Sequence, residues 1–228
     1  MAAQPPVLTI RRKFPRPTKE QLAAFHAAPT GFVVDARGRQ GALDFRIRPL
    51  TTKTRFCGPA LAVTSRPRDN LAAWAALEVA QPGDVVIITT RAYEEAAVIG
   101  DNYVAMAKNC GVVAVVTDGM ARDLPGIEDV GIPVFARGLT PNSPFKDGPG
   151  DAGLTISIGG VAVGSGDLLV GDQDGVVVVP LAEIDETVEA LAEVTKKEAG
   201  MERRIRDGAH APEWLAATLA QKGVRYVD

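Results

Sequence analysis

Hydrophobic residues form two kinds of pattern along the middle of the chain, and the two kinds alternate. Short runs rich in β-branched residues are typical of buried strands, and they include FCGPALAVTS, DVVIITT, VVAVVTD and IPVFAR. Segments with apolar residues at helical spacing lie between them, among them DNLAAWAALEVAQPGD and a helix expected from about Asn102 to Cys110. This alternation predicts an α/β domain that contains parallel strands.

The amino-terminal region has a different composition. Residues 1–17 hold four prolines and a basic cluster, and we expect an extended arm there. The segment TKEQLAAFHAA then has Thr18 as N-cap and Gln21 at the third helical position, which is a capping box. The sequence predicts a short helix that Pro29 and Gly31 end.

The later part of the chain changes to short β-rich runs separated by glycine turns, LTISIGGVAVGSGDLLVGDQDGVVVVP. These runs predict antiparallel hairpins, one of them turning at Asp174-Gly175, rather than a nucleotide loop or a calcium loop. A helix from about Leu181 to Asp207 and a short helix in PEWLAATLAQKG follow. We therefore expect a mixed sheet in a single domain over residues 18–208, with a helical tail at 209–228.

Composition limits the classes of partner. The 228 residues are 46% hydrophobic, so a substantial core is possible, and the formal net charge of -3 gives no electrostatic reason to expect nucleic acid. No apolar run approaches the roughly 20 residues of a membrane span, and the amino terminus lacks the apolar region of a signal peptide. We expect a cytoplasmic protein that binds no membrane.

Few soft metal ligands are available. The chain has two cysteines, Cys57 and Cys110, and two histidines, His26 and His210, that lie far apart in the sequence. Neither a disulfide framework nor a cysteine-based zinc site fits this pattern. Any metal would be held mainly by oxygen, which points to Mg²⁺ or Mn²⁺.

One stretch, Gly100 to Gly126, carries charged residues at both ends of a nearly apolar segment. If DVVIITT, the helix and VVAVVTD form a β-α-β unit, a right-handed crossover brings Asp101 and the pair Arg122-Asp123 to one edge of the sheet. The free N–H groups at the helix start and the arginine fork suit a carboxylate, and the two acids suit a divalent ion. On spacing alone, however, a helix cap at Asp101 and a surface ion pair at Arg122-Asp123 are the simpler interpretations.

Four segments resemble the RraA-like superfamily, which includes 4-hydroxy-4-methyl-2-oxoglutarate (and 4-carboxy-4-hydroxy-2-oxoadipate) aldolase. They are GDNYVAMAKNCGVVAVVTDGMARD, GDVVIIT, GPALAVTSRPRDNLAAWAAL and GDLLVGDQDGVVVVP, and the similarity runs from about residue 30 to 208. The resemblance implies a phosphohistidine-swivelling-type α/β sandwich, assembled as homotrimers or homohexamers with sites at subunit interfaces. It also implies a class II, Mg²⁺- or Mn²⁺-dependent pyruvate aldolase that cleaves 4-hydroxy-2-oxo diacids, often with oxaloacetate decarboxylase activity.

The same resemblance implies roles for individual residues. Asp123 would hold the metal, Arg122 would bind the carboxylate or enolate oxygen of the substrate, and Asp101 would orient a metal-bound water. Proton transfer would fall to ordered water beside Asp101, because no histidine is at hand. The pyruvate moiety of the 2-oxoacid would bind backbone amides of Gly100, Asp101, Asn102 and Tyr103.

The family also uses a glutamate from the carboxyl-terminal helix of a neighbouring subunit. In this chain an alternating four-three spacing from Ile184 to Ile205 places Glu198 and Glu202 on an otherwise apolar stripe. A carboxylate on such a face needs a partner. We favour Glu198 as the catalytic residue because Gly200 can shift the helical phase beyond it, and charge near a helix end is the competing explanation.

Two further positions bear on the substrate. Related sequences commonly have an acid three positions after the aspartate of the Arg-Asp pair, whereas this chain has Gly126, a departure that touches substrate choice. Lys146, in the loop PNSPFKDGPG, is a candidate substrate-binding cation, and a solvated loop lysine is the simpler interpretation.

Two other functions are attached to the same superfamily. Some members are non-enzymatic regulators that mask RNase E, and such a protein would need none of Asp101, Arg122, Asp123 and Glu198. A menaquinone-pathway methyltransferase would need an S-adenosylmethionine loop, and the sequence shows no glycine-rich strand-to-helix turn of that kind. The complete residue set favours the aldolase.

Overall fold

The computed structural model describes residues 6–228, and its centre is one mixed sheet. Within these residues the sheet has nine strands, and its main path runs in the order β1-β10-β3-β4-β6-β8-β2. The strands of this path are β1 (Leu8–Ile10), β2 (Arg48–Pro49), β3 (Phe56–Ser65), β4 (Val85–Thr89), β6 (Ala114–Thr117), β8 (Val134–Ala136) and β10 (Gly150–Ala152). The α/β class and the mixed sheet predicted from the sequence are confirmed.

Four parallel strands, β3, β4, β6 and β8, form the middle of the sheet. Their residues are almost all apolar because both faces are covered, and all of β4 and β6 is buried. Helices follow three of these strands along the chain: α3 (Leu71–Ala76), α4 (Asp101–Asn109) and α5 (Leu124–Val130). The predicted β-α-β unit is confirmed, since Val85 of β4 pairs in parallel with Ala114 of β6 and α4 lies between them in sequence.

Two hairpins pack on the opposite face of the main path of the sheet, and one of them supplies the remaining two of the nine strands. Strands β11 (Ile156–Ile158) and β12 (Val161–Val163) form one, and β13 (Leu168–Asp172) and β14 (Gly175–Val179) form the other. Strand β13 also pairs antiparallel with β3. Because Asp172 pairs with Gly175, the predicted turn at Asp174-Gly175 is confirmed. Separate apolar clusters fill the two faces, one beneath α3, α4 and α5 and one beneath the hairpins.

The amino-terminal helices only partly match the expectation. The capping box is present: the Gln21 amide N–H donates to the Thr18 hydroxyl at 3.2 Å and closes the start of α1 (Lys19–Ala23). However, α1 ends well before Pro29, and a helix that the sequence did not reveal, α2 (Thr30–Ala36), begins directly after that proline and contains Gly31. The prediction that Pro29 and Gly31 end one helix was wrong, because an extended proline can equally precede a helix.

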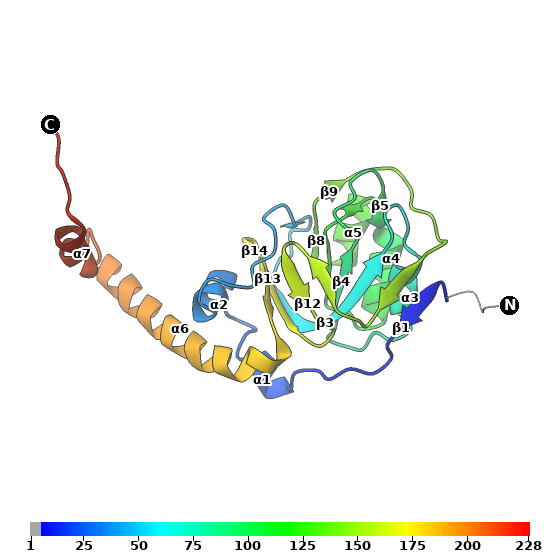
Figure 1. Ribbon diagram of the computed structural model, residues 1–228, viewed down its shortest axis with the longest axis horizontal. Helices are drawn as coiled ribbons and strands as arrows, with labels where there is room; N and C mark the ends of the chain where they lie inside the picture. The colour runs from blue at the N-terminus through cyan, green and yellow to red at the C-terminus, as the bar shows by residue number, and fades with distance from the viewer. Residues whose placement is uncertain (1–5) are drawn as a thin grey trace.

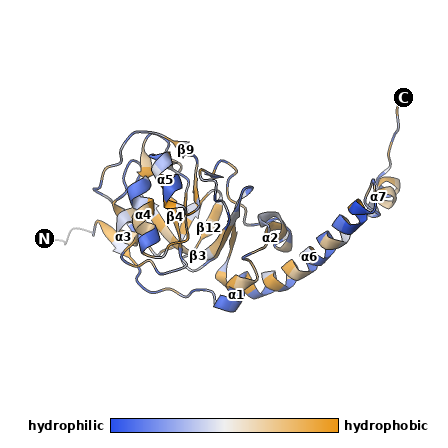
Figure 2. Ribbon diagram, turned by 180° about the vertical axis from the view of Figure 1, so that it is seen from behind, coloured by the Kyte–Doolittle hydropathy of each residue, from blue (hydrophilic) through white to orange (hydrophobic). Residues whose placement is uncertain are grey.

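The carboxyl-terminal helix leaves the body of the molecule (Figure 1). A 3₁₀ turn (Leu181–Glu183) leads into α6 (Ile184–Arg206), and α7 (Trp214–Lys222) follows at its outer end. The 23 residues of α6 span about 35 Å, and its first turns pack against α2. Figure 2 shows that its outer part is largely hydrophilic, whereas α7 carries apolar residues. Among residues 6–228, no helix is both long and apolar enough to cross a bilayer.

The predicted extended arm is held to the body at two places within its described residues. Strand β1 pairs in parallel with β10, with Thr9 opposite Asp151. Further along, the Arg16 guanidinium donates two hydrogen bonds of 2.9 Å to the carboxylate of Asp84, whose side chain is fully buried. This stretch is therefore part of the folded unit from Leu8 onward, and residues 1–5 lie outside the described residues.

Candidate functional site

A second, smaller sheet places the charged residues of the site. Its strands β5 (Ala97–Ile99), β7 (Met120–Ala121) and β9 (Gly138–Leu139) run parallel in that order. Ile99 pairs with Ala121, and the Arg122 amide N–H donates to the Ile99 carbonyl at 3.1 Å. The residues after β5 and the residues after β7 therefore emerge side by side. The sequence predicted this convergence but attributed it to the ends of longer strands.

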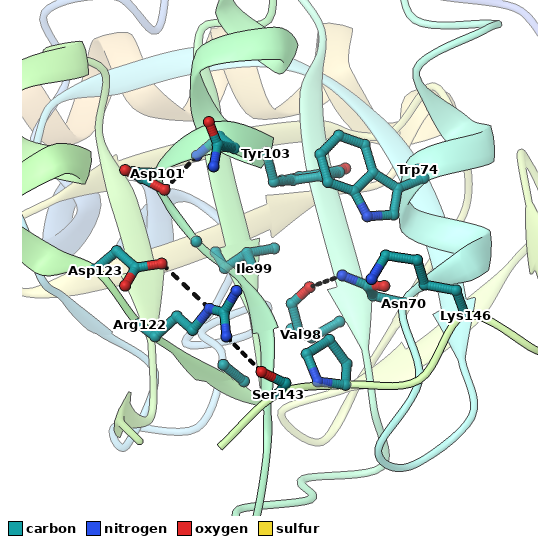
Figure 3. A pocket seen from close by; sticks show the side chains of 14 residues that line it. Asn70, Trp74, Val98, Ile99, Asp101, Tyr103, Arg122, Asp123, Ser143 and Lys146 are labelled. Atoms are coloured by element: carbon teal, nitrogen blue, oxygen red, sulfur yellow. Dashed lines mark hydrogen bonds and ion pairs between the residues drawn. The ribbon is translucent and has the colours of Figure 1, made fainter. Parts of the chain in front are cut away.

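These residues line one cavity of about 250 Å³ (Figure 3). All six residues that the sequence assigned to this part of the site are on its wall: Gly100, Asp101, Asn102, Tyr103, Arg122 and Asp123. The other lining residues include Asn70, Trp74, Val98, Ser143 and Lys146. The cavity is therefore charged at the Asp101 and Asp123 end, and α3 and the Lys146 loop form its other end.

Arg122 is braced on two sides. Its Nε lies 3.2 Å from Asp123 Oδ2, and its Nη1 donates to the Ser143 hydroxyl at 2.6 Å. Both side chains of the ion pair remain partly exposed, at 39% and 47%. Within the described residues, Nη2 has no protein partner at hydrogen-bonding distance. The guanidinium is thus fixed in place with donor capacity left for an anion in the cavity.

Asp123 adopts an unusual backbone conformation. Its φ of 62° and ψ of 43° lie in the left-handed region, which aspartate tolerates better than most residues but still at an energetic cost. The residue occupies the cap position of α5 without a side-chain cap hydrogen bond. Its carboxylate therefore lines the cavity, where Oδ2 pairs with Arg122, rather than engaging the helix behind it.

Two glycines allow the acids to approach the helix start. A Cβ atom at position 100 would lie 2.8 Å from Asp123 Oδ2, and one at position 126 would lie 2.7 Å from both Cβ and Oδ2 of Asp101. Any side chain at either position would push a carboxylate out of place. This explains the departure at Gly126: an acidic side chain there is incompatible with the observed position of Asp101.

Replacing Gly126 with alanine should therefore damage the site more than the fold. In a helix, alanine is more stabilising than glycine by up to about 1 kcal/mol. Here, however, its methyl group must displace Asp101. The rate of a reaction catalysed in this cavity should then fall by about 10-fold or more, because small misplacements of reacting groups are costly. Steady-state kinetics and thermal unfolding measure the two effects. The matched control is Gly31→Ala in α2, where a Cβ meets nothing within 4 Å, and unchanged turnover in Gly126→Ala would contradict the argument.

The amino end of α4 forms the floor of the charged end. The cap position is Gly100, so the simpler interpretation of Asp101 as a helix cap was wrong, although its Oδ1 accepts from the Asn102 N–H at 2.6 Å. The first N–H groups of a helix lack partners within the helix and favour an anion. Tyr103 contributes through its backbone only, because its buried hydroxyl donates to the Ala73 carbonyl and burial raises the pKa of its phenol.

Three polar residues of the cavity were not recognised from the sequence as site residues: Asn70, Trp74 and Ser143. Asn70 is the cap residue of α3 and Trp74 lies within that helix, which follows β3 along the chain. A polar residue in the turn between a parallel strand and the next helix was therefore the signal that could have revealed Asn70. Ser143 lies on the loop that also carries Lys146, and Lys146 does line the cavity.

Glu198 is not part of this cavity in its own chain. It lies half-buried on α6 and borders a separate hollow with Asp35 and Arg39, whereas Glu202 is exposed. Within a single chain the structure does not bring Glu198 to Asp123. A role for Glu198 at the site requires α6 of another subunit, as the resemblance implies.

The cysteines do not offer a second chemistry. Cys57 and Cys110 are both half-buried, and their thiols contact the Leu22 and Leu77 carbonyls. Burial raises the pKa of the Cys57 thiol to about 12, so it stays protonated at neutral pH and is a poor nucleophile.

The fold and the cavity together define an α/β protein with a small charged cavity built from two strand-to-helix turns. The family model described as RraA-like, Aldolase/RraA, matches residues 30–178. A Halalkalibacterium halodurans protein named "Putative 4-hydroxy-4-methyl-2-oxoglutarate aldolase" is 34% identical over 190 residues, which are 83% of this chain and 90% of the relative. The chain belongs to the RraA-like family.

Two solved structures have a fold similar to that of this chain, and one of them is described as an RraA family member. Streptomyces coelicolor RraAS2, described as an unusual member of the RNase ES inhibitor RraA protein family, matches with a TM-score of 0.74 at 28% identity, covering 83% of this chain and 100% of that one. A Geobacillus kaustophilus structure titled S-adenosylmethionine: 2-dimethylmenaquinone methyltransferase matches with a TM-score of 0.63 at 28% identity, covering 67% and 95%. Proteins similar to this chain therefore carry several functional names, and the chemistry of the site is needed to choose among them.

Proposed function

We propose that this protein is a metal-dependent lyase that cleaves 4-hydroxy-2-oxo diacids, such as 4-hydroxy-4-methyl-2-oxoglutarate, to pyruvate and a second carbonyl compound. Decarboxylation of oxaloacetate is the expected side reaction. The observation that carries the proposal is that Asp101, Arg122 and Asp123 share one cavity with the amino end of α4. The aldolase name of a relative that is 34% identical supports it.

The donors present fit a Mg²⁺ or Mn²⁺ ion. Among the described residues, no group of three or more His, Cys, Asp or Glu side chains is placed to hold a metal, so a single chain offers no all-protein cage. Mg²⁺ is commonly held by one or two carboxylates, with substrate and water completing its shell. Asp123 would bind the ion, with Asp101 close by. When bound, the ion would supply Lewis-acid polarisation of the keto group.

Other residues of the chain would then bind the substrate and transfer the proton. Arg122 and the free N–H groups of α4 would bind the 2-oxoacid carboxylate and the oxygen on which negative charge develops. Asp101 would hold a water that accepts the proton of the 4-hydroxyl group as the bond between C3 and C4 breaks. The electron pair of that bond passes to C3, which is protonated from water to give pyruvate.

Assembly as a homotrimer or homohexamer belongs to the same proposal. Helix α6 extends from the body, and Glu198 on it does not reach the cavity of its own chain. In an oligomer, α6 of a neighbouring subunit would bring Glu198 to the site as a further acid. This part of the proposal rests on the family resemblance.

Pyruvate release from oxaloacetate tests the metal-dependent activity. We expect EDTA to lower the enzyme-dependent rate more than about 100-fold, because a Lewis-acid ion contributes several kcal/mol to such a step. Excess Mg²⁺ or Mn²⁺ should restore the rate. Each assay needs a reaction without protein at the same metal concentration, since oxaloacetate decays unaided.

The alternative function is a non-enzymatic regulator of RNase E, which the likeness to RraAS2 favours. A rate that equals the protein-free reaction with either metal, for oxaloacetate and for 4-hydroxy-4-methyl-2-oxoglutarate, would support the regulator and overturn the lyase.

A further inference from the structure

The wall opposite the charged end of the cavity carries two buried polar atoms without partners among the described residues. They are Oδ1 of Asn70, a residue that is 6% exposed, and Nε1 of Trp74. The two residues are four apart at the start of α3, so they face the same side of that helix. A buried polar atom left unpaired costs about 1–3 kcal/mol, so both atoms are expected to meet a ligand or water.

Neighbouring contacts fix the direction of both groups. The Asn70 Nδ2 donates to the Val98 carbonyl at 3.0 Å, so its Oδ1 is an acceptor directed elsewhere. The Trp74 indole packs edge-to-face on Tyr103, with the ring centroids 5.1 Å apart. An indole N–H can only donate. The wall therefore presents one acceptor and one donor, and Lys146 lines the same cavity (Figure 3).

Lys146 is held beside α3 by a buried carboxylate. Asp69 is 1% exposed, and its Oδ2 accepts from the amides of Asp147 at 2.7 Å and Gly148 at 3.1 Å. Its Oδ1 accepts from the Leu71 amide at 2.9 Å, which ties the same loop to the start of α3. The backbone that carries Lys146, an exposed residue, is thereby fixed at this end of the cavity.

We propose that Trp74, Asn70 and Lys146 form a distal subsite that reads the part of the substrate beyond the bond to be broken. The Trp74 N–H and the Lys146 ammonium donate to the second carboxylate, and Asn70 Oδ1 accepts from a water that hydrates that carboxylate. This subsite rests on the proposed lyase function, because Arg122 and Asp123 must hold the 2-oxoacid end for the other end to point at α3. Buried groups that lack a partner in a smaller analogue reject that analogue, so Trp74 sets substrate choice.

Binding of two uncleavable oxoacids isolates the subsite from catalysis. 2-Oxoglutarate has the distal carboxylate and no 4-hydroxyl group, and 2-oxopentanoate has the same chain length without that carboxylate. By calorimetry with Mg²⁺, the natural protein should prefer 2-oxoglutarate. Trp74→Phe keeps an aromatic ring against Tyr103 and removes the N–H together with the rest of the pyrrole ring, so it should weaken 2-oxoglutarate about 10-fold and 2-oxopentanoate less than about twofold.

Two further variants keep the test decisive. Trp214→Phe changes the other tryptophan, which is 60% exposed on α7, and should leave both affinities unchanged. Lys146→Gln alters an exposed loop residue, so the fold should persist, and it should also weaken 2-oxoglutarate selectively. If Trp74→Phe proves unstable in a thermal melt, Lys146→Gln carries the test of the subsite.

The outcomes separate this inference from the proposed function. Equal affinity of the natural protein for the two oxoacids, or equal losses for both in Trp74→Phe, would overturn the subsite. Selective loss in Lys146→Gln with none in a folded Trp74→Phe would overturn the role of Trp74. Selective binding of 2-oxoglutarate without pyruvate release from any 4-hydroxy-2-oxo diacid would overturn the lyase and leave the subsite standing.

Discussion

Replacing Arg122 with lysine is expected to lower kcat/KM for pyruvate release by about 10³-fold without unfolding the protein. The guanidinium uses Nε for Asp123 and Nη1 for Ser143 and still has Nη2 to offer the substrate. A lysine ammonium is a single point charge, so it cannot keep both braces and bind the substrate with the same geometry. The pair is partly exposed, and its loss should therefore change the melting temperature little.

The matched control for this experiment is Arg46→Lys. Arg46 also pairs with an aspartate, Asp44, but it lies outside the residues that line the cavity. Its substitution should change kcat/KM by less than about twofold, in line with the small energies of exposed ion pairs. If Arg122→Lys kept more than about a tenth of the natural activity, arginine geometry would not be essential and the assigned role would fail.

Replacing Arg16 with methionine should destabilise the protein by about 3–5 kcal/mol, the usual cost of leaving one partner of a buried ion pair alone. Asp84 has no exposed side-chain surface, and it receives both hydrogen bonds from Arg16 at 2.9 Å. Among the described residues, only the Gln81 amide, also at 2.9 Å, would remain as a hydrogen-bond donor to this carboxylate. For a chain of this length we expect the melting temperature to fall by roughly 10 °C.

Urea and thermal unfolding monitored by circular dichroism measure this effect. Arg46→Met is the control, because it removes an arginine from a pair in which the arginine side chain is 60% exposed, and it should cost less than about 1 kcal/mol. Equal losses in Arg16→Met and Arg46→Met would show that burial of Asp84 does not set the cost.

The sequence predicted long, regular elements well because each has a clear period. The apolar runs became β3, β4 and β6, and the helix expected at Asn102–Cys110 is α4 shifted by one residue. It did not predict β5 and β7, because strands of three and two residues contain no measurable alternation. The pairing of β5 with β7 places Asp101 near Arg122. The predicted convergence is therefore present, although the prediction did not include the two strands that produce it.

The distal wall could not be predicted for a different reason. The sequence placed Asn70 and Trp74 only within the helical segment DNLAAWAALEVAQPGD, which contains α3. What distinguishes them is an unpaired buried atom, a property of packing rather than of residue type or spacing. The role of Gly126 was hidden in the same way, since only the distance to Asp101 shows why a side chain is excluded.

Strand β1 shields one side of β10, whose other side is occupied by β3. Without β1, the backbone groups of Gly150–Ala152 on that side would be open to strand addition from another molecule, which is a common route to aggregation. Strand β10 begins only a few residues after Lys146. A polypeptide shortened past Ile10, or fused there to a bulky partner, would therefore risk both insolubility and a disturbed substrate preference.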